Sequence, residues 1–199
     1  MGRQAGYDRG KVLAQAQALF WSKGFLGTSL KDLETALDMR PGSIYAAFGS
    51  KEALFAEALK SYAQHSREAF RQTVAQAGSP LAGLAAHVRA LGCVADNRPP
   101  SQACMLVKTM LETPPDNADL LGLTETLIQS MEAAFAEMFR QAIQTGELPQ
   151  TADPDRLASR LQAEIFGLRT YAQRKGSDAR VAQMAEDIAR DIEALRVAA

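Results

Sequence analysis

The stretch MRPGSIYAAFGSKEALF, Met39 to Phe55, decides the fold of this chain. A short helix is predicted to begin at Pro41, because proline suits the first turn of a helix, where its missing N–H would have no partner. Ile44 and Phe48 lie four residues apart and should share one buried face of that helix. A second helix follows at once, capped by Ser50. A helix this short, with a polar tip and one apolar face, is typical of the reading helix of a helix-turn-helix unit.

Two further helices are expected before this stretch. The first spans about residues 9–23, where apolar residues recur at helical spacing. The second begins after Thr28 or Ser29, and Ser29 with Asp32 three residues later forms an approximate capping box. We therefore expect residues 1–50 to form a three-helix, helix-turn-helix DNA-binding domain.

The remainder of the chain is also predicted to be helical. Strand-like alternation is absent, and breaks rich in Pro, Gly, Asn or Asp separate segments of helical periodicity. The fold class is therefore all-α, with residues 51–199 forming a C-terminal helical bundle for ligand sensing and dimerisation. A long helix follows Ser50, and others are expected at about 80–96, 101–113, 117–145, 154–175 and 178–197.

Composition restricts the class of protein. The net charge is −1; residues 1–65 hold eight Lys and Arg against six Asp and Glu, and the remainder holds 14 against 17. This small asymmetry has the sign expected of a DNA-facing N-terminus. No apolar run approaches 18 residues, and two cysteines do not make a disulfide scaffold. We expect a cytoplasmic protein that binds no membrane, cofactor or metal.

The tip of the predicted reading helix carries side chains suited to DNA. Arg40 offers paired donors to a guanine or a phosphate, and Ser43 can bond to either. Gly42 leaves room for close approach, and Tyr45 on the exposed side can reach a phosphate. The N–H groups at the starts of two neighbouring helices would bind further phosphates. The expected DNA-binding residues are Thr28, Ser29, Arg40, Pro41, Gly42, Ser43, Tyr45 and Lys51.

Residues 9–60 resemble the N-terminal signature of the tetracycline-repressor (TetR) family of bacterial regulators. The matching features are the Gly-Phe after the first helix, Thr28-Ser29 at the start of the second, and GSIYAAFGSKEALF across the third and fourth. The resemblance implies a two-fold homodimer that binds double-stranded operator DNA without ligand and leaves it when a small molecule enters the C-terminal domain. The family often has an aromatic or His pair after the tyrosine. This chain has Ala46-Ala47 there, so base reading would depend more on Arg40 and Ser43.

One cysteine lies where a helix start would activate it. If Ser101 is an N-cap, Cys104 is the third helical residue, and both the helix dipole and Lys108 four residues on favour the thiolate. The segment Cys-x-x-Val-Lys also resembles a pattern in a branch of the TetR family that detects electrophiles and oxidants through cysteine. The alternative is inert packing, since free cysteine is often a buried small hydrophobe. Whether Cys104 or Cys93 is a sensor stays open.

Apolar residues of the C-terminal region indicate a ligand pocket and a dimer interface. Met and aromatic residues there either wall a pocket between helices or form ordinary core. The last two helices each carry an apolar stripe, which we expect to pack against a second copy; the alternative is packing within the monomer. The candidate sensor residues are Cys104, Lys108, Met105, Phe135, Phe139 and Phe166, and the candidate dimer residues are Leu161, Ile165, Leu168, Ile188, Ile192 and Leu195.

No enzyme motif competes with this interpretation. A helical-bundle metalloenzyme would need ligands such as Glu-x-x-His, and neither His65 nor His87 has a Glu three residues before it. The sequence also lacks a glycine-rich phosphate loop, a nucleophile elbow and a zinc-type cysteine pair. It predicts a one-component transcriptional regulator, a repressor released by a small molecule or by thiol modification. The alternative is a constitutive helix-turn-helix DNA-binding protein with no ligand response.

Overall fold

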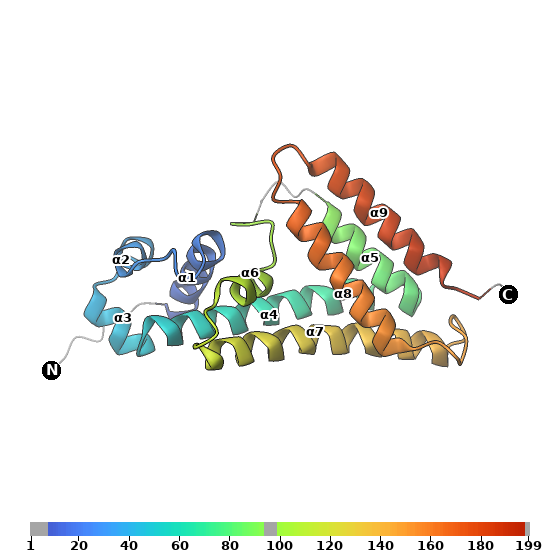
Figure 1. The fold of residues 1–199 in the computed structure, drawn as a ribbon, viewed down its shortest axis with the longest axis horizontal. Coiled ribbons are helices and arrows are strands. Elements are labelled where there is room, and N and C mark those ends of the chain that lie inside the picture. Colours follow the sequence, from blue (N-terminus) through green and yellow to red (C-terminus); the bar gives the residue numbers. More distant parts are fainter. Residues whose placement is uncertain (1–7, 94–98, 198–199) are drawn as a thin grey trace.

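The computed structural model describes residues 8–93 and 99–197, and every element in these residues is a helix (Figure 1). The all-α prediction is confirmed. Within the described residues, no helix combines the length and apolar character needed to cross a membrane. The helices are α1 (Arg9–Lys23), α2 (Leu30–Leu37), α3 (Pro41–Phe48), α4 (Lys51–Ala75), α5 (Pro80–Gly92), α6 (Met105–Glu112), α7 (Ala118–Gln144), α8 (Pro154–Tyr171) and α9 (Asp178–Ala194).

The first four helices begin where their capping residues predict. The Asp8 carboxylate accepts from two backbone N–H groups at the start of α1. Ser29 and Asp32 form the complete capping box of α2, and Pro41 is the first residue of α3. The Ser50 hydroxyl accepts from the Ala53 N–H at 3.0 Å and starts α4. Local signals therefore place the helix-turn-helix unit almost residue by residue.

Helix α4 connects the two ends of the molecule. Figure 1 shows α1–α3 at one end, α5, α8 and α9 at the other, and α4 and α7 running between them. The buried side chains form two clusters, one joining α1–α4 to parts of α6 and α7, the other joining α5, α7, α8 and α9. The clusters divide within α4, between Ala63 and Phe70. A displacement along α4 would therefore change the packing of both clusters. The domain boundary at residue 50 stays a prediction.

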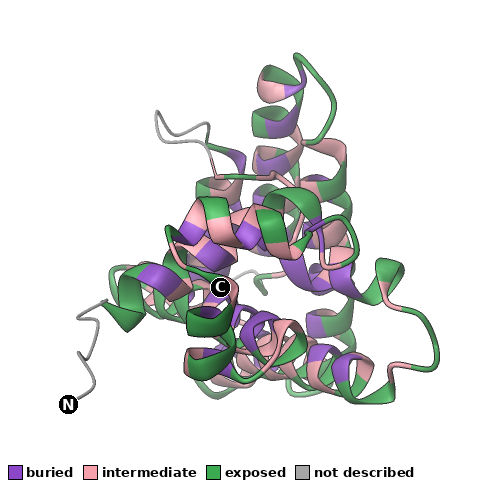
Figure 2. Ribbon diagram, turned by 90° about the vertical axis from the view of Figure 1, so that its left-hand side faces the viewer, coloured by how far each residue is buried: buried purple, intermediate pink, exposed green. Residues whose placement is uncertain are grey.

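The apolar stripes of α8 and α9 pack mainly against the monomer's own core, which corrects the dimer role predicted for the four most buried of the six residues. Leu161, Ile165, Leu168 and Ile192 are between 1% and 7% exposed and belong to the second cluster. Ile188 and Leu195 are half-buried against the same cluster. Figure 2 shows the buried residues on the sides of the helices that face one another. A stripe reveals an apolar face but not its partner, and here the partners are α5 and α7 of the same chain.

Helices α5 and α9 approach closely, which explains why the centre of the α9 stripe is buried inside the monomer. A Cβ built on Gly92 would lie 2.3 Å from the Ala185 Cβ, so only glycine permits this approach. At the flank, Arg89 donates to Glu186 at 2.7 Å and to Glu193 at 2.6 Å. The Arg89 hydrogen bond is the main cause that lowers the pKa of Glu186 to about 2.

Helix α6 is shorter than expected, because its N-terminal segment has other partners. It begins at Met105 rather than near residue 101. The carbonyl oxygen of Gln102 accepts from Arg169 at 3.1 Å, and that of Ala103 accepts from Trp21 at 2.7 Å. These carbonyls are bound by side chains from distant helices instead of by helical N–H groups. At α5, the predicted extension to residue 96 ends at Gly92, and residues 94–96 lie outside the described ranges.

Candidate nucleic-acid interface and effector cavity

The tip of α3 is exposed while its apolar face is buried. Arg40 is the N-cap, and the Ser43 N–H donates to the Arg40 carbonyl oxygen at 2.9 Å. Arg40, Gly42 and Ser43 are exposed, and Tyr45 is 43% exposed. A Cβ at Gly42 would meet no atom of the rest of the protein within 4 Å, so internal packing does not require glycine there. We call the accessible surface formed by Arg40, Pro41, Gly42, Ser43 and Tyr45 the α3 tip.

Arg9 holds the opposite end of α3, and nothing in the sequence pattern indicated this role. Its guanidinium lies 4.5 Å from the centre of the Phe48 ring and donates to the Ala47 carbonyl oxygen at 2.9 Å. It also pairs with Glu57 at 2.7 Å, 48 residues away in the chain. One side chain of α1 therefore joins α3 to α4 and orients the α3 tip.

Thr28 does not have an accessible hydroxyl, which corrects its predicted phosphate contact. It is 0% exposed, and its hydroxyl donates to the Gly24 carbonyl oxygen at 2.7 Å. The Ser29 hydroxyl is also engaged, since it bonds to the Asp32 carboxylate at 2.6 Å. Lys23 pairs with that carboxylate at 2.5 Å and is the largest cause that lowers the pKa of Asp32. The capping box also occupies the N–H groups of Ser29 and Asp32, so at this helix start the N–H groups of Leu30 and Lys31 remain for a phosphate.

Replacing Thr28 by valine is expected to lower the free energy of unfolding by about 1–3 kcal/mol, because the Gly24 carbonyl oxygen loses its buried donor. DNA affinity should be unchanged. Urea denaturation and a gel shift on the same preparation check both, with Ser22→Ala as the matched control for an exposed hydroxyl that bonds to a backbone carbonyl. Unchanged stability together with lost DNA binding would restore Thr28 to the phosphate contacts.

Lys51 lies at the first turn of α4, where its ammonium is held by an aromatic ring. Its Nζ lies 4.4 Å from the centre of the Phe25 ring. The side chain is half-buried, so the charge is fixed beside the helix start rather than extended into solvent. A positive charge placed next to free N–H groups favours an anion at this point.

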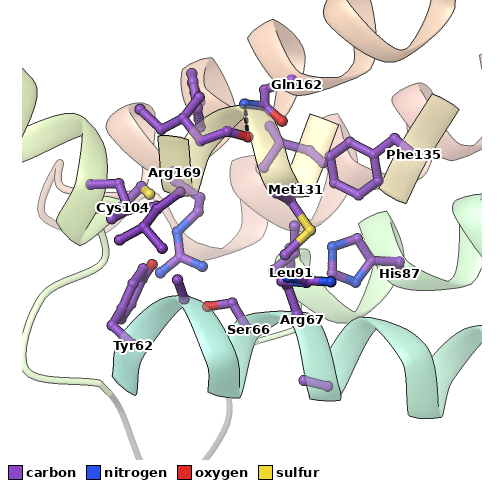
Figure 3. A pocket seen from close by; sticks show the side chains of 17 residues that line it. Tyr62, Ser66, Arg67, His87, Leu91, Cys104, Met131, Phe135, Gln162 and Arg169 are labelled. Atoms are coloured by element: carbon purple, nitrogen blue, oxygen red, sulfur yellow. Dashed lines mark hydrogen bonds between the residues drawn. The ribbon is translucent and has the colours of Figure 1, made fainter. Parts of the chain in front are cut away.

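A cavity of about 200 Å³ lies among α4, α5, α7, α8 and the start of α6 (Figure 3). Of the candidate sensor residues, Cys104, Phe135 and Phe166 line it. Met105 and Phe139 are 1% exposed and belong to the two buried clusters instead. The wall is mostly apolar, with a few polar groups converging on it, an arrangement typical of small-molecule sites.

Two family models match the chain. One, described as bacterial regulatory proteins of the tetR family, covers residues 12–58, and the other, described as a tetracyclin repressor-like C-terminal domain, covers residues 80–189. The second alone spans more than half of the 199 residues. The chain belongs to the TetR family.

Known TetR-family relatives resemble it along most of its length. The HTH-type transcriptional repressor ComR of Escherichia coli is 27% identical over 189 residues, covering 92% of this chain and 88% of that protein. The HTH-type transcriptional regulator YezE of Bacillus subtilis is 30% identical over 149 residues, covering 74% and 76%. The TetR-family regulator CifR, solved as a cysteine mutant on a 26-base-pair operator, is 30% identical with a TM-score of 0.86, covering 95% and 98%. The predicted DNA-binding transcriptional regulator is confirmed.

Cys104 of this TetR-family chain is not activated in the way the sequence indicated. It is the N-cap of α6 rather than its third residue, and its side chain makes no capping bond. The Lys108 ammonium donates to the carbonyl oxygens of Trp21 at 2.9 Å and Ser22 at 3.2 Å, so it is engaged at the end of α1. The thiol instead bonds to the buried Tyr62 hydroxyl, whose pKa is raised by burial and secondly by Cys104. Cys93 is exposed at the end of α5.

His87 is a buried cavity residue, a role that the sequence analysis did not predict. It is 8% exposed, with its ring centre 4.9 Å from that of Phe70 and 5.9 Å from that of Phe135. Burial, and secondly the charge of Arg169, lowers the pKa of His87 to about 4. The histidine is therefore neutral at pH 7 and acts as an aromatic wall of the cavity.

The stability of the protein should fall as the pH drops from about 6.5 to 4. Because the pKa of His87 is lower in the folded state than the ordinary 6.5, the unfolded chain binds more protons in this window. The contribution of neutral His87 to the free energy of unfolding is present above pH 6.5. It is lost as the pH falls below this value, with a slope of up to about 1.4 kcal/mol per pH unit. Urea denaturation of His87→Phe should lack this component. The exposed His65→Gln control should keep it, and equal slopes in wild type and His87→Phe would contradict the assignment.

Five other polar lining residues were missed: Gln162 and Arg169 on α8, and Tyr62, Ser66 and Arg67 on α4. The sequence feature that could have indicated Gln162 and Arg169 as cavity residues is their position beside the apolar stripe of α8, where each follows a buried leucine. A polar residue at the edge of a stripe is ordinarily a solvent-facing residue, so that signal alone does not indicate a cavity.

Proposed function

We propose that the α3 tip reads operator DNA in the major groove and that the protein is a repressor acting in the cytoplasm, without catalytic activity. The observation that carries this proposal is the joint exposure of Arg40, Ser43 and Tyr45 around an open Gly42. Arg40 and Ser43 would meet base edges, and Tyr45 a phosphate. The N–H groups that begin α2 and α4 would add phosphate contacts, with Lys51 supplying charge at α4.

A homodimer would present two such tips to the two halves of a symmetric site. Since the most buried residues of the α8 and α9 stripes pack inside the monomer, we propose that the partly exposed edge of the α9 stripe meets a second copy, with half-buried Met184, Ile188 and Leu195 at the contact. Reading helices related by a two-fold axis would then lie about one DNA turn, roughly 34 Å, apart or further.

A segment of chain connects the cavity to the DNA-binding end. Cys104 and Leu106 line the cavity, and the neighbouring Ala103 and Lys108 hold the end of α1 through their bonds with Trp21 and Ser22. A small molecule that displaces this segment would also move α1, and with it Arg9 and α3. We propose that effector binding releases DNA by this path, which requires different affinities for the two states.

Modification of Cys104 is a second route to the same displacement, because the thiol lines the cavity and bonds to Tyr62. Cys104→Ser separates the two routes. A variant that keeps the response to a small molecule but loses the response to thiol reagents would show that both operate. If Cys104→Ser keeps the response to thiol reagents, Cys104 is not the residue through which they act.

Selection of bound duplexes from a random DNA library with the purified full chain tests the DNA-reading proposal. The expected outcome is a two-fold symmetric site whose affinity falls steeply with salt, since Lys and Arg contacts to phosphates release counterions. Equal affinity for selected and scrambled duplexes would contradict sequence reading. Binding that no cavity ligand weakens would favour a constitutive DNA-binding protein.

A further inference from the structure

The cavity carries positive charge without a negative partner in its wall. Among the described residues that line it are Arg67 and Arg169, and none of them is an aspartate or glutamate. Arg67 lies at the exposed edge, where it donates to the Ser130 hydroxyl at 2.8 Å. Figure 3 shows Arg169 reaching from α8 toward Tyr62 and Ser66 of α4. The Arg169 Nε donates to the Gln102 carbonyl oxygen, which leaves the terminal nitrogens of the guanidinium for a ligand. A guanidinium without a carboxylate partner beside a mostly apolar space favours an anionic ligand.

Gln162 supplies a second, independent sign of a ligand. It is 4% exposed, and its Nε2 donates to the Ile128 carbonyl oxygen at 3.2 Å. Its Oε1 is buried and has no hydrogen-bond donor among the described residues. A buried acceptor without a donor is unfavourable and uncommon in folded proteins. A hydroxyl or N–H group of a bound molecule would satisfy it.

The two polar groups come from positions two turns apart on α8. Gln162 and Arg169 are seven residues apart on α8, so they lie on one face, separated by about 10 Å along the helix axis. Ile165 and Phe166 lie between them and also line the cavity, together with Met131 and Phe135 of α7. The cavity of about 200 Å³ corresponds to roughly seven waters at about 30 Å³ each. A single substituted ring suits this space.

We propose that the effector is a small aromatic carboxylate whose carboxylate pairs with Arg169 and whose opposite end donates a hydrogen bond to Gln162 Oε1. The ring packs between Phe135, Phe166 and Met131. Tyr62 and Ser66, beside Arg169, provide hydroxyl groups for the carboxylate. This inference names the ligand class of the cavity in the proposed function and rests on that function for its regulatory meaning.

Trp21 makes binding measurable without DNA. It is the single tryptophan of the chain, its ring lies 5.9 Å from the Arg169 guanidinium, and its ring centre lies 5.0 Å from that of Tyr62. The probes are 4-hydroxybenzoate, 4-hydroxyphenylacetate and benzoate, each paired with its neutral amide. In the wild-type full chain, the hydroxy acids should bind at least about tenfold more tightly than their amides, a difference of about 1.4 kcal/mol. They should also bind more tightly than benzoate, which lacks the donor for Gln162.

Variants assign that preference to the two side chains. Arg169→Met should abolish the acid-to-amide ratio, Arg169→Lys should retain most of it, and Gln162→Leu should abolish only the advantage of the hydroxyl. The control is Arg174→Met, whose guanidinium lies 4.8 Å from the centre of the Tyr171 ring, outside the cavity. Using affinity ratios within each variant removes the effect of a general loss of fold.

Two results would overturn the inference: no acid binds the wild type, or acids and amides bind equally. Failure of the regulatory proposal looks different. If the acids bind with the predicted preference but leave DNA affinity unchanged, the ligand class stands and the release mechanism does not.

Discussion

Replacement of Arg40 by alanine is expected to weaken binding to the selected operator by about tenfold or more for each half-site, and by the product of the two in a dimer. A bidentate arginine contact to a guanine is worth about 1–3 kcal/mol of discrimination. Ala46-Ala47 follow Tyr45, so few large side chains at the α3 tip can replace the lost contact. Fluorescence anisotropy of a labelled operator at fixed salt measures the affinity.

The control for this prediction is Arg180→Ala, which removes an exposed arginine of α9, outside the helix-turn-helix unit. It should leave operator affinity unchanged. Arg40 makes no side-chain capping bond to α3, so the unfolding free energy of Arg40→Ala should stay within about 0.5 kcal/mol of the wild type. Retained affinity in a folded Arg40→Ala protein would contradict the assignment of this side chain to base reading.

Leu168→Ala should destabilise the protein by about 2–5 kcal/mol, because it removes a buried side chain from a packed core. Leu168 is 1% exposed within a single chain. Ile188→Ala, at a half-buried position on the partly exposed edge of the α9 stripe, should cost less stability and should instead raise the dimer dissociation constant. Urea denaturation and sedimentation equilibrium on each variant measure the two quantities.

If Leu168→Ala instead dissociated the dimer while the monomer kept its stability, the buried apolar stripe would be the dimer contact. Both variants should be compared at one protein concentration, since the apparent stability of an obligate dimer depends on it.

The DNA-binding end could be predicted well because its signals are local. A proline at a helix start, a serine with an aspartate three residues on, and Ile44 with Phe48 four residues apart each act within one turn of helix. Each local preference agrees with the final fold, so α1–α4 begin and end close to where the sequence indicates. The exposure of Tyr45 follows from the same spacing.

Most of the features that the sequence did not predict depend on contacts between distant parts of the chain. The start of α6 was misplaced because Trp21 and Arg169 bind the carbonyls of residues 102 and 103. Thr28 was taken for a phosphate contact because its place before a helix does not show that its hydroxyl turns inward to the Gly24 carbonyl oxygen, only four residues away. The apolar stripe of α9 was assigned to a second copy because the periodicity of α9 does not show its partner. That partner is α5, where Gly92 has no side chain and lets α9 approach closely. The side chains that line the cavity come from α4, α5, α7, α8 and the start of α6, so no spacing within one stretch of sequence connects them.

The central claim is that occupancy of the cavity and binding of DNA oppose one another through the start of α6. The most direct test is the affinity of the wild-type full chain for its selected operator, with and without the tightest-binding compound of the probe set. The compound is added until the Trp21 signal is saturated, at constant salt. The account predicts that affinity falls by about tenfold or more, a coupling free energy of about 1.4 kcal/mol. Unchanged operator affinity at full occupancy of the cavity would contradict it.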